Sequence, residues 1–454
     1  MRKYFGTDGI RRIANTELTP ELVYKVAKAG AYVLSKHTNH TPTILIGRDT
    51  RISGTLIESA MVAGFLSYGA NVKLLGVIPT PAVAYLTRKL NADASVVISA
   101  SHNTFEFNGI KFFSNKGMKI PDTLEEEIEE VMESGKINEL TAVSSKIGIS
   151  EYCADLLEEY VYFFRKNFDD VISEINRDDF VVGIDTANGA TSVVAEKVFK
   201  ALGIKYKIIN NTPDGININD HCGSTHLDSL KKFVVDNKLS LGVAYDGDGD
   251  RCLAIDENGN EIDGDIIMAV VSNYLKSKGK LKNDTLVATV MSNLGLHKYA
   301  KENGIELKQT KVGDRYVLEE MLKEGYNLGG EQSGHVILLD YNPTGDGILT
   351  SLMLIQAILE SKKQASELIK IIKLYPQVLI NAKVSTDKKY GYENDAEIKE
   401  AIQKLEEEFS GNGRVLIRPS GTEPLVRVMI EGEDQEYITK KAQEIADLIE
   451  KKLK

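Results

Sequence analysis

Three aspartates alternate with glycines in the segment DGDGD, which follows the apolar run LGVAY. The glycines permit a tight backbone path that turns Asp246, Asp248 and Asp250 toward one point. Three carboxylates this close repel one another unless a cation neutralises them, and hard oxygen ligands suit Mg²⁺. An EF-hand calcium loop is a poor alternative, because Arg251 stands where that loop needs glycine and the flanks are typical of strands. The segment therefore predicts a magnesium site at the end of a buried strand.

A hydroxyl and an imidazole follow a second apolar run, in the segment VVISASHN. The GxSxG elbow of α/β hydrolases does not surround Ser101, although a Ser-His-Asp triad assembled from distant segments stays open. A hydrolase would have no use for the acidic loop or for the arginine-bearing segment RPSGTEPLVR. A serine beside a magnesium site and a phosphate loop instead favours a phosphoryl carrier at Ser101.

The segment RPSGTEPLVR gathers donors around a turn between two strands. Hydroxyls, exposed backbone N–H groups and guanidinium forks are what a phosphate monoester requires. A β-turn with incidental arginines is the alternative. The shorter segments GRDTR and KVGDR each place an arginine beside an acid, which by itself is more typical of a structural salt bridge. The candidate phosphate ligands are Arg418, Ser420, Gly421, Thr422 and Arg427.

The segment GGEQSGH combines a glycine turn with Glu331, Ser333 and His335. Glutamate accepts hydrogen bonds from neighbouring sugar hydroxyls, and serine both donates and accepts. A single histidine is usually structural, but this one lies in a polar, glycine-lined turn after an apparent strand. The segment is therefore a candidate sugar-binding loop.

Three stretches share the pattern of an apolar run, a helix-like segment and a second apolar run. They cover residues 43–76, 180–210 and 285–313, and each predicts a βαβ unit with parallel strands. The C-terminal part reads strand–loop–strand–helix. We therefore expect three related α/β domains with mixed or parallel sheets and a smaller α+β domain, with boundaries at 1–150, 151–251, 252–368 and 369–454. Ser101 lies in the first, the acidic loop in the second, the sugar loop in the third and the arginine loop in the last.

Composition narrows the class of protein. The chain has 454 residues, 42% of them hydrophobic and 27% charged, and a formal net charge of −11, which disfavours nucleic acid or an anionic membrane as partner. We find no apolar run of about 18 residues and no pattern of a signal peptide. Cys153, Cys222 and Cys252 show no CxxC pairing, so we expect reduced thiols and a cytoplasmic protein.

Taken together, the motifs resemble the α-D-phosphohexomutase family, and within it the members that act on glucosamine phosphates. The resemblance runs in the correct order over nearly the whole chain. The motifs are FGTDGIR, GRDTR, SASHN, NGIKFF, DTANGAT, PDGININ, CGSTH, DGDGDR, DGDIIM, VMSNLGL, GEQSGH and RPSGTEP.

The resemblance implies four domains around a central cleft and reversible interconversion of glucosamine 6-phosphate and glucosamine 1-phosphate, a step of amino sugar metabolism that feeds cell-wall precursor synthesis. Ser101 would be the phosphoserine that donates its phosphoryl group to the sugar, giving a 1,6-bisphosphate that turns around and returns its other phosphoryl group. A glucosamine or glucose 1,6-bisphosphate would be the activator. Asp246, Asp248 and Asp250, together with the phosphoserine, would hold one Mg²⁺ per site.

The resemblance also implies supporting roles. Arg11 and Arg251 would stabilise the transferred group. His102 would orient the serine loop or contact the phosphate, with an acid/base role as its alternative. Lys111 is the first candidate for the acid/base group, with a pKa that we expect to be depressed, and His335 is the second. Glu331 and Ser333 would contact the sugar, and the RPSGTEP loop the non-reacting phosphate.

Several alternatives stay open at this point. A phosphoglucomutase or phosphomannomutase specificity would use the same chemistry, and Gln332 in GEQSGH favours glucosamine. A non-catalytic sugar-phosphate-binding protein is disfavoured, because every residue that the chemistry needs is present. The oligomeric state is open, with a homodimer as one option. Two positions depart from the family pattern: Thr104 where proline is usual, and Arg12 where glycine is usual.

Overall fold

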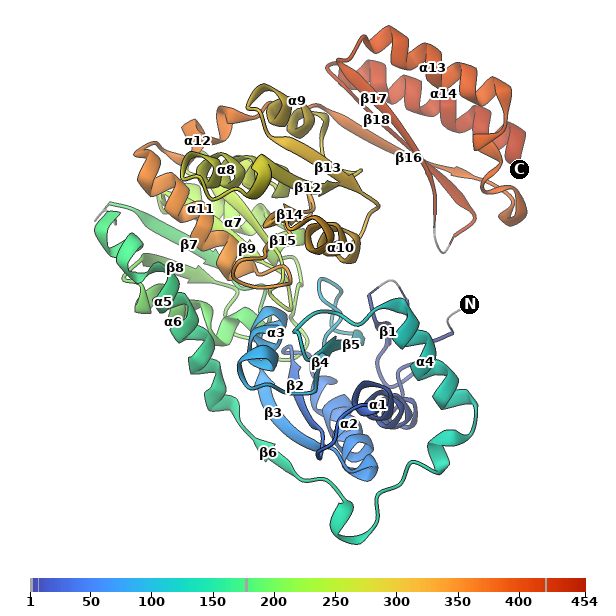
Figure 1. The fold of residues 1–454 in the computed structure, drawn as a ribbon. Coiled ribbons are helices and arrows are strands. Elements are labelled where there is room, and N and C mark those ends of the chain that lie inside the picture. Colours follow the sequence, from blue (N-terminus) through green and yellow to red (C-terminus); the bar gives the residue numbers. More distant parts are fainter. Residues whose placement is uncertain (1–2, 7, 176–178, 421–422) are drawn as a thin grey trace. The chain divides into compact units, whose positions relative to one another are not determined.

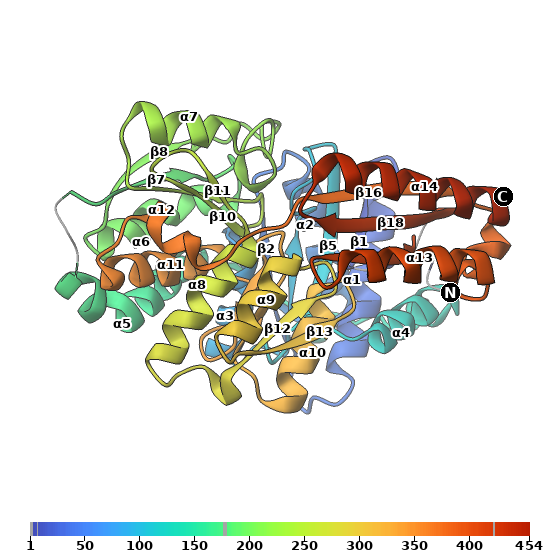
Figure 2. The ribbon, with the colours of Figure 1, turned by 90° about the horizontal axis from the view of Figure 1, so that it is seen from above.

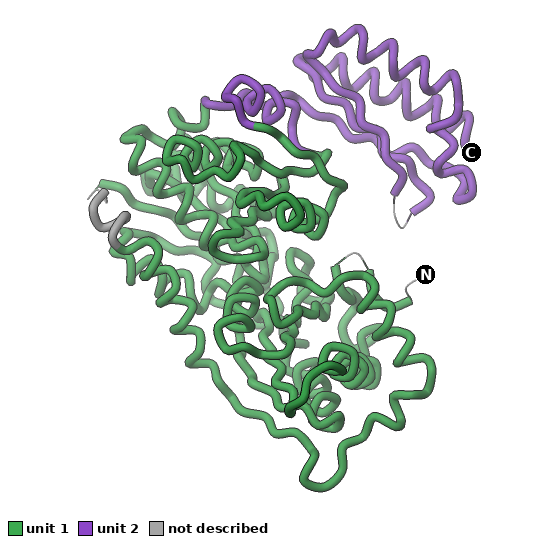
Figure 3. Tube along the Cα trace, in the orientation of Figure 1, with its two compact units in different colours: residues 1–291, 306–370 green, residues 292–305, 371–454 purple. Residues whose placement is uncertain are grey.

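A computed structural model describes residues 3–6, 8–175, 179–420 and 423–454. The chain divides into two compact units, which are coloured separately in Figure 3. The first unit comprises Met1–Met291 and Glu306–Lys370, and the second comprises Ser292–Ile305 and Ile371–Lys454. Among the described residues, no helix has the length and apolar character needed to cross a membrane.

The first unit begins with a six-stranded sheet in the order β1-β5-β4-β2-β3-β6 (Figure 1). The expected βαβ unit is present, because β2 pairs in parallel with β3 and α2 connects them. The elements are β1 (Ile10–Ile13), α1 (Pro20–Ser35), β2 (Thr43–Arg48), α2 (Gly54–Tyr68), β3 (Asn71–Val77), α3 (Thr80–Lys89), β4 (Ala94–Ile98), β5 (Phe107–Ser114), α4 (Asp122–Glu133) and β6 (Ser150–Tyr152).

A five-stranded sheet follows, in the order β11-β10-β9-β7-β8. Strand β10 pairs antiparallel with β9, so this sheet continues beyond residue 251, where we expected the third domain to begin. The reason is that the acidic loop is a hairpin connection and not a boundary. The elements are α5 (Leu157–Ile175), β7 (Val181–Asp185), α6 (Ala195–Ala201), β8 (Lys205–Ile209), α7 (Asp228–Asp236), β9 (Leu241–Tyr245), β10 (Cys252–Asp256) and β11 (Glu261–Ile262).

The third sheet has four strands in the order β13-β12-β14-β15. Helix α11 is apolar on all sides and is buried along most of its length, as expected for such a helix. The elements in the first unit are α8 (Gly264–Ser277), β12 (Thr285–Thr289), β13 (Glu306–Thr310), α10 (Asp314–Glu324), β14 (Leu328–Gly330), β15 (Val336–Leu338), α11 (Gly347–Ser361) and α12 (Ala365–Leu368).

The second unit is the expected α+β module. Its antiparallel sheet has the order β16-β18-β17, and α13 and α14 lie side by side over it (Figures 1 and 2). Apolar side chains of both layers, such as Val428 and Ile445, form its core. The elements are α9 (Leu294–Glu302), β16 (Gln377–Lys383), α13 (Ala396–Phe409), β17 (Gly413–Pro419), β18 (Leu425–Gly432) and α14 (Gln435–Leu453).

Candidate active site

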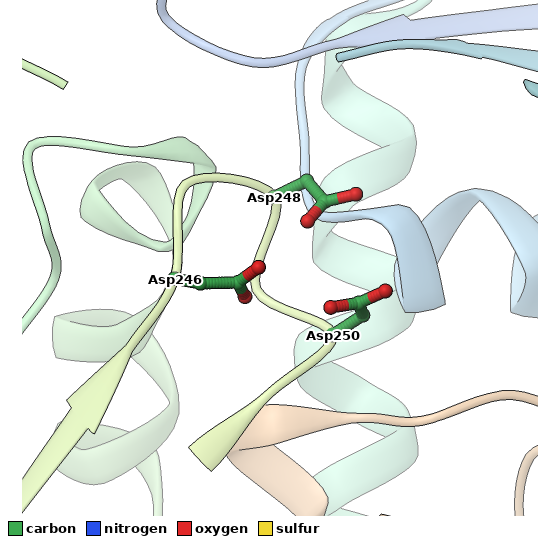
Figure 4. A group of neighbouring side chains, drawn as sticks. All are labelled: Asp246, Asp248 and Asp250. Atoms are coloured by element: carbon green, nitrogen blue, oxygen red, sulfur yellow. The ribbon is translucent and has the colours of Figure 1, made fainter. Parts of the chain in front are cut away.

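The acidic loop connects β9 to β10 and brings its three carboxylates together (Figure 4). One oxygen from each of Asp246, Asp248 and Asp250 lies within 4.8 Å of the others, and all three residues are buried. Oδ1 of Asp248 and Oδ1 of Asp250 have no hydrogen-bond partner among the described residues. Buried carboxylate oxygens without partners, converging on one point, fit a hard divalent cation such as Mg²⁺. The donor set that the sequence predicted is therefore assembled.

Neighbouring groups fix these carboxylates and set their charge. Thr80 Oγ1 donates to Asp248 Oδ2 at 2.7 Å. Burial together with the Asp250 and Asp248 carboxylates raises the pKa of Asp246 well above its usual range. Burial acts the same way on Asp250, but the nearby His335, Lys111 and Arg251 outweigh it and hold the pKa of that carboxyl below its usual range. The pKa values of Asp246 and Asp250 are thus shifted in opposite directions.

Ser101 lies beside this loop, although it belongs to the first sheet. Its Oγ donates to Asp246 Oδ2 at 2.7 Å. Its backbone is left-handed, with φ at 52°, a conformation that costs a non-glycine residue about 1–3 kcal/mol and persists only where its surroundings fix it. The two loops approach each other so closely that a Cβ at Gly247 would lie 2.5 Å from Ser101 O. Glycine at 247 is therefore required for this contact.

His102 follows the serine, with Nδ1 3.4 Å from Ser101 Oγ. Burial, together with the Arg251 and Arg11 guanidinium groups, lowers the pKa of His102 to about 4. The ring is therefore neutral near pH 7 and a weak base. The role of His102 in orienting the loop stays a prediction.

Lys111 differs from the expectation. Its Nζ lies 2.9 Å from Asp248 Oδ2 and 3.2 Å from Asp8 Oδ2. Burial lowers the pKa of Lys111, but Asp248 and Asp8 outweigh burial and raise it well above its ordinary value. The predicted depression of this pKa is wrong, because Asp8 and Asp248, which lie far from Lys111 in the sequence, are its neighbours in the fold.

A cavity of about 420 Å³ lies in front of Ser101. Of the predicted site residues in the first unit, Asp246, Asp248 and Lys111 are not among the described residues that line it. The predicted residues that do line it are Arg11, Ser101, His102, Asp250, Arg251, Glu331, Ser333 and His335.

His335 is buried in the wall of this cavity. Its Nδ1 lies 3.4 Å from Asp250 Oδ2, and its Nε2 accepts a hydrogen bond from Gly345 N at 3.0 Å. Burial lowers the pKa of His335, but Asp250 and Asp314 raise it more, so that it lies above its ordinary value. The imidazole is held on both nitrogens and faces the carboxylate of the acidic loop.

The sugar loop lies between β14 and β15. Glu331 Oε1 accepts a hydrogen bond from Gly313 N at 3.1 Å, and Gln332 Nε2 donates to Asp263 Oδ2 at 3.2 Å. Ser333 is exposed at the cavity. The loop thus presents a glutamate, an amide and a hydroxyl to the same space as Ser101.

The arginine loop lies in the second unit, between β17 and β18. Arg418 on β17 and Arg427 on β18 are directly opposite one another, an arrangement that is unfavourable for like charges unless an anion lies between them. Burial, together with Arg427, lowers the pKa of Arg418. Ser420 is buried, and its carbonyl accepts a hydrogen bond from Lys389 Nζ, a residue that the sequence did not suggest. Gly421 and Thr422 lie outside the described residues.

Five further charged residues line the cavity and were missed: Asp8, Lys119, Asp122, Asp314 and Arg315. Lys119 Nζ lies 2.6 Å from Asp8 Oδ1 and 2.7 Å from Asp314 Oδ2. Asp8 and Asp314 stand in the motifs FGTDGIR and KVGDR, so the motifs contained a signal for both. Lys119 had none, because it follows a strand without any recognisable pattern.

The two departures from the family pattern have structural accounts. Thr104 N–H has no hydrogen-bond partner in the described part of the chain, so threonine uses no backbone donor that proline would lack. Its side chain, by contrast, makes a hydrogen bond to the Glu106 carboxylate that proline could not make. Thr104 O accepts from Arg51 Nη1, a bond that either residue would make. Arg12 Nη2 donates to Lys3 O at 2.9 Å, and its guanidinium lies over the Tyr4 ring.

Comparison with known proteins completes the picture. The phosphoglucomutase/phosphomannomutase family models match residues 2–139 (α/β/α domain I), 158–259 (domain II), 263–375 (domain III) and 379–448 (C-terminal domain). The chain belongs to this family. It is 54% identical over 453 residues to a phosphoglucosamine mutase of Ruminiclostridium cellulolyticum, and equally to one of Acetivibrio thermocellus, with 100% of each chain covered. A phosphoglucomutase/phosphomannomutase family protein of Burkholderia thailandensis has the same fold, with a TM-score of 0.81 at 21% identity over 98% of this chain and 97% of that one.

The family and the fold class expected from the sequence are therefore confirmed. As a phosphohexomutase, the chain is an enzyme of the isomerase class, an intramolecular phosphotransferase, and its function is that of the phosphoglucosamine mutases to which it is similar over its whole length.

Proposed function

We propose that the protein interconverts glucosamine 6-phosphate and glucosamine 1-phosphate, with Ser101 as the phosphoryl carrier. The observation that carries this proposal is the 2.7 Å contact of Ser101 Oγ with Asp246, at the wall of a cavity lined by arginine, lysine and histidine. A hydroxyl beside a cation site, open to a cavity that carries arginine and lysine side chains, suits transfer of a phosphoryl group. The relatives at 54% identity support glucosamine phosphate as the substrate.

Asp246, Asp248 and Asp250 would hold a magnesium ion, which when bound supplies positive charge beside the phosphoryl group. The chain's own residues do the rest. Arg11 and Arg251 line the cavity on the side of Ser101 and stabilise the negative charge of the group in transfer. Glu331 and Ser333 bind the sugar hydroxyls, and Gln332 is held against Asp263 beside them.

The reaction follows from one carrier serving both ends of the sugar. Phosphoserine 101 transfers its phosphoryl group to the free hydroxyl of the bound sugar phosphate, and the serine oxygen leaves. The resulting 1,6-bisphosphate turns around and returns its other phosphoryl group to Ser101. Arg418, Ser420 and Arg427, with Gly421 and Thr422, bind the phosphate that does not react.

The sugar hydroxyl must lose a proton, and the serine oxygen must gain one. Lys111 and His335 are the candidates. His335 lines the cavity, whereas Lys111 lies behind it on Asp248 and Asp8. If His335 carries the proton, His335→Asn lowers kcat about 10²–10⁴-fold, the usual contribution of one acid/base group. Lys111→Met then acts mainly by removing the cation beside the buried Asp248 carboxylate, and lowers stability as well as kcat.

Specificity is tested by kcat/KM for the 6-phosphates of glucosamine, glucose and mannose, measured side by side on enzyme that was phosphorylated beforehand. Glucosamine 6-phosphate is expected to give the highest value. A higher value for glucose or mannose phosphate would instead assign a phosphoglucomutase or phosphomannomutase specificity. A cytoplasmic location and a homodimer stay predictions from the sequence.

A further inference from the structure

Arg51 is a fully buried cation that the reaction as proposed does not use. It lies in the loop between β2 and α2 and is 1% exposed. Its Nε donates to Asp49 Oδ2 at 2.8 Å, which neutralises its charge. The rest of the guanidinium is directed at the loop of Ser101: it donates to Ser101 O at 3.0 Å, Asn103 O at 2.8 Å, Phe107 O at 3.0 Å and Thr104 O.

Asp49 extends this support to the backbone nitrogen of the serine. Ser99 Oγ donates to Asp49 Oδ2 at 2.6 Å and accepts from Ser101 N at 2.9 Å. Both backbone polar groups of Ser101 are thus held by one buried ion pair, directly at its carbonyl and through Ser99 at its amide.

A second donor reaches the same carbonyls from the second sheet domain. Asn219 Nδ2 donates to Ser101 O at 2.9 Å and to Asn103 O at 2.9 Å. Asn219 is 3% exposed and is itself anchored, because its N–H donates to Ala187 O at 2.9 Å. The loop is therefore bonded both to the sheet that carries Ser101 and to the domain that carries Asp246.

This convergence bears on function because Ser101 adopts a left-handed backbone, with φ at 52°. A non-glycine residue keeps such a conformation only where its surroundings determine it, and such positions cluster at reactive sites. Here the conformation directs Oγ to Asp246. An arginine beside an acid usually forms only a structural salt bridge. Such an arginine would have no reason to direct all its remaining N–H donors to one loop.

We propose that Arg51 and Asn219 are positioning residues that clamp the Ser101 loop from two domains and thereby hold Ser101 Oγ at the acidic loop for phosphoryl transfer. The inference rests on the proposed function, in which Ser101 is the phosphoryl carrier. It adds two residues outside the cavity to those that determine the rate.

The test compares Arg51→Lys and Asn219→Asp with the unmodified enzyme in the presence of Mg²⁺. Lysine keeps the charge beside Asp49 but lacks the planar fork, and aspartate keeps the shape of asparagine but cannot donate. Each variant is expected to lower kcat about 100-fold, the cost of a misplacement of about 1 Å, while KM changes less than about 3-fold. Phosphorylation of Ser101 by glucose 1,6-bisphosphate, followed by intact mass, is expected to slow by a similar factor.

The matched controls are Arg48→Lys and Asn217→Asp. Arg48 belongs to the same GRDTR motif as Arg51 but pairs with Glu58. Asn217 lies two residues from Asn219, and within the described part of the chain its hydrogen bonds stay in its own turn and reach Asn188. Both controls are expected to keep kcat within about 2-fold. If Arg51→Lys does not fold, Asn219→Asp alone decides. Folded variants that retain kcat and the phosphorylation rate would overturn the inference while the unmodified enzyme turns over, whereas an unmodified enzyme without turnover would overturn the proposed function and the inference together.

Discussion

Ser101 Oγ and Asp246 Oδ2 are 2.7 Å apart, although 145 positions separate the two residues along the chain. One follows β4 of the first sheet, and the other follows β9 of the second. Loops at the ends of strands are where α/β folds gather reactive groups, and here two such loops from different sheets meet.

Ser101→Ala is expected to abolish turnover, with a loss in kcat of at least about 10³-fold, because no other hydroxyl replaces the carrier. Intact mass of the purified unmodified enzyme should show a fraction heavier by about 80 Da, the mass of an added phosphoryl group, which is absent from the variant. Retention of most activity by Ser101→Ala would contradict the assignment of the carrier.

Mg²⁺ is expected to stabilise the protein, because it binds the folded acidic loop and neutralises three buried carboxylates. At a concentration of 100 times its Kd, the gain is about 2.7 kcal/mol, seen as a rise in Tm that EDTA reverses. Asp246→Asn should remove most of this rise, whereas Asp236→Asn at the end of α7 should keep it. Equal rises in all three proteins would place the cation elsewhere.

Much of this site could be predicted because its chemistry is local in the sequence. The DGDGD loop carries all three acids within five residues, and Ser101 lies in the loop that follows a buried strand. The three βαβ units were visible as apolar runs around helical spacing, and all three are present. Such patterns can be predicted because residues close together in the sequence determine the local backbone geometry and which side chains are buried.

What the sequence could not show are the pairings between distant charges. Lys119 meets Asp8 and Asp314 across long separations, and these contacts explain why the cavity's charges are matched. The same limit caused the error in the pKa of Lys111, since the value depends on Asp248 and Asp8, which fold next to it from elsewhere. The predicted boundary at residue 251 was also wrong, since the second sheet continues past it. In the sequence, a short charged loop within one sheet looks the same as a loop between two domains.

Arg427→Ala is expected to raise KM for the sugar phosphate about 10–100-fold, the worth of a hydrogen bond from a charged donor to phosphate. The change also removes a like charge directly opposite Arg418, so Tm should not fall. Steady-state kinetics and thermal unfolding measure the two effects. Lys383→Ala, at the end of β16, is the matched control and should leave KM unchanged. A fall in Tm with unchanged KM would assign Arg427 a structural role only.

His297 in the second unit makes stability depend on pH. Burial, together with Arg414, which donates to Nε2 at 3.2 Å, lowers the pKa of His297 to about 4. The unfolded chain takes up this proton near pH 6.5 and the folded chain only near pH 4, so the contribution is complete above pH 6.5 and is lost as the pH falls toward 4. After allowance for solvent screening, the loss is about 1–2 kcal/mol.

The measurement is the urea midpoint of the second unit's unfolding at pH 7 and at pH 4.5, for unmodified protein and for His297→Gln. The variant cannot take up this proton in the unfolded state, so its midpoint should fall less between the two pH values. His221→Gln is the control, since the His221 side chain is 89% exposed and should leave the pH dependence as it is. Parallel pH dependences for the unmodified protein and His297→Gln would show that Arg414 does not hold the imidazole neutral, because a ring that titrates alike in both states contributes no slope.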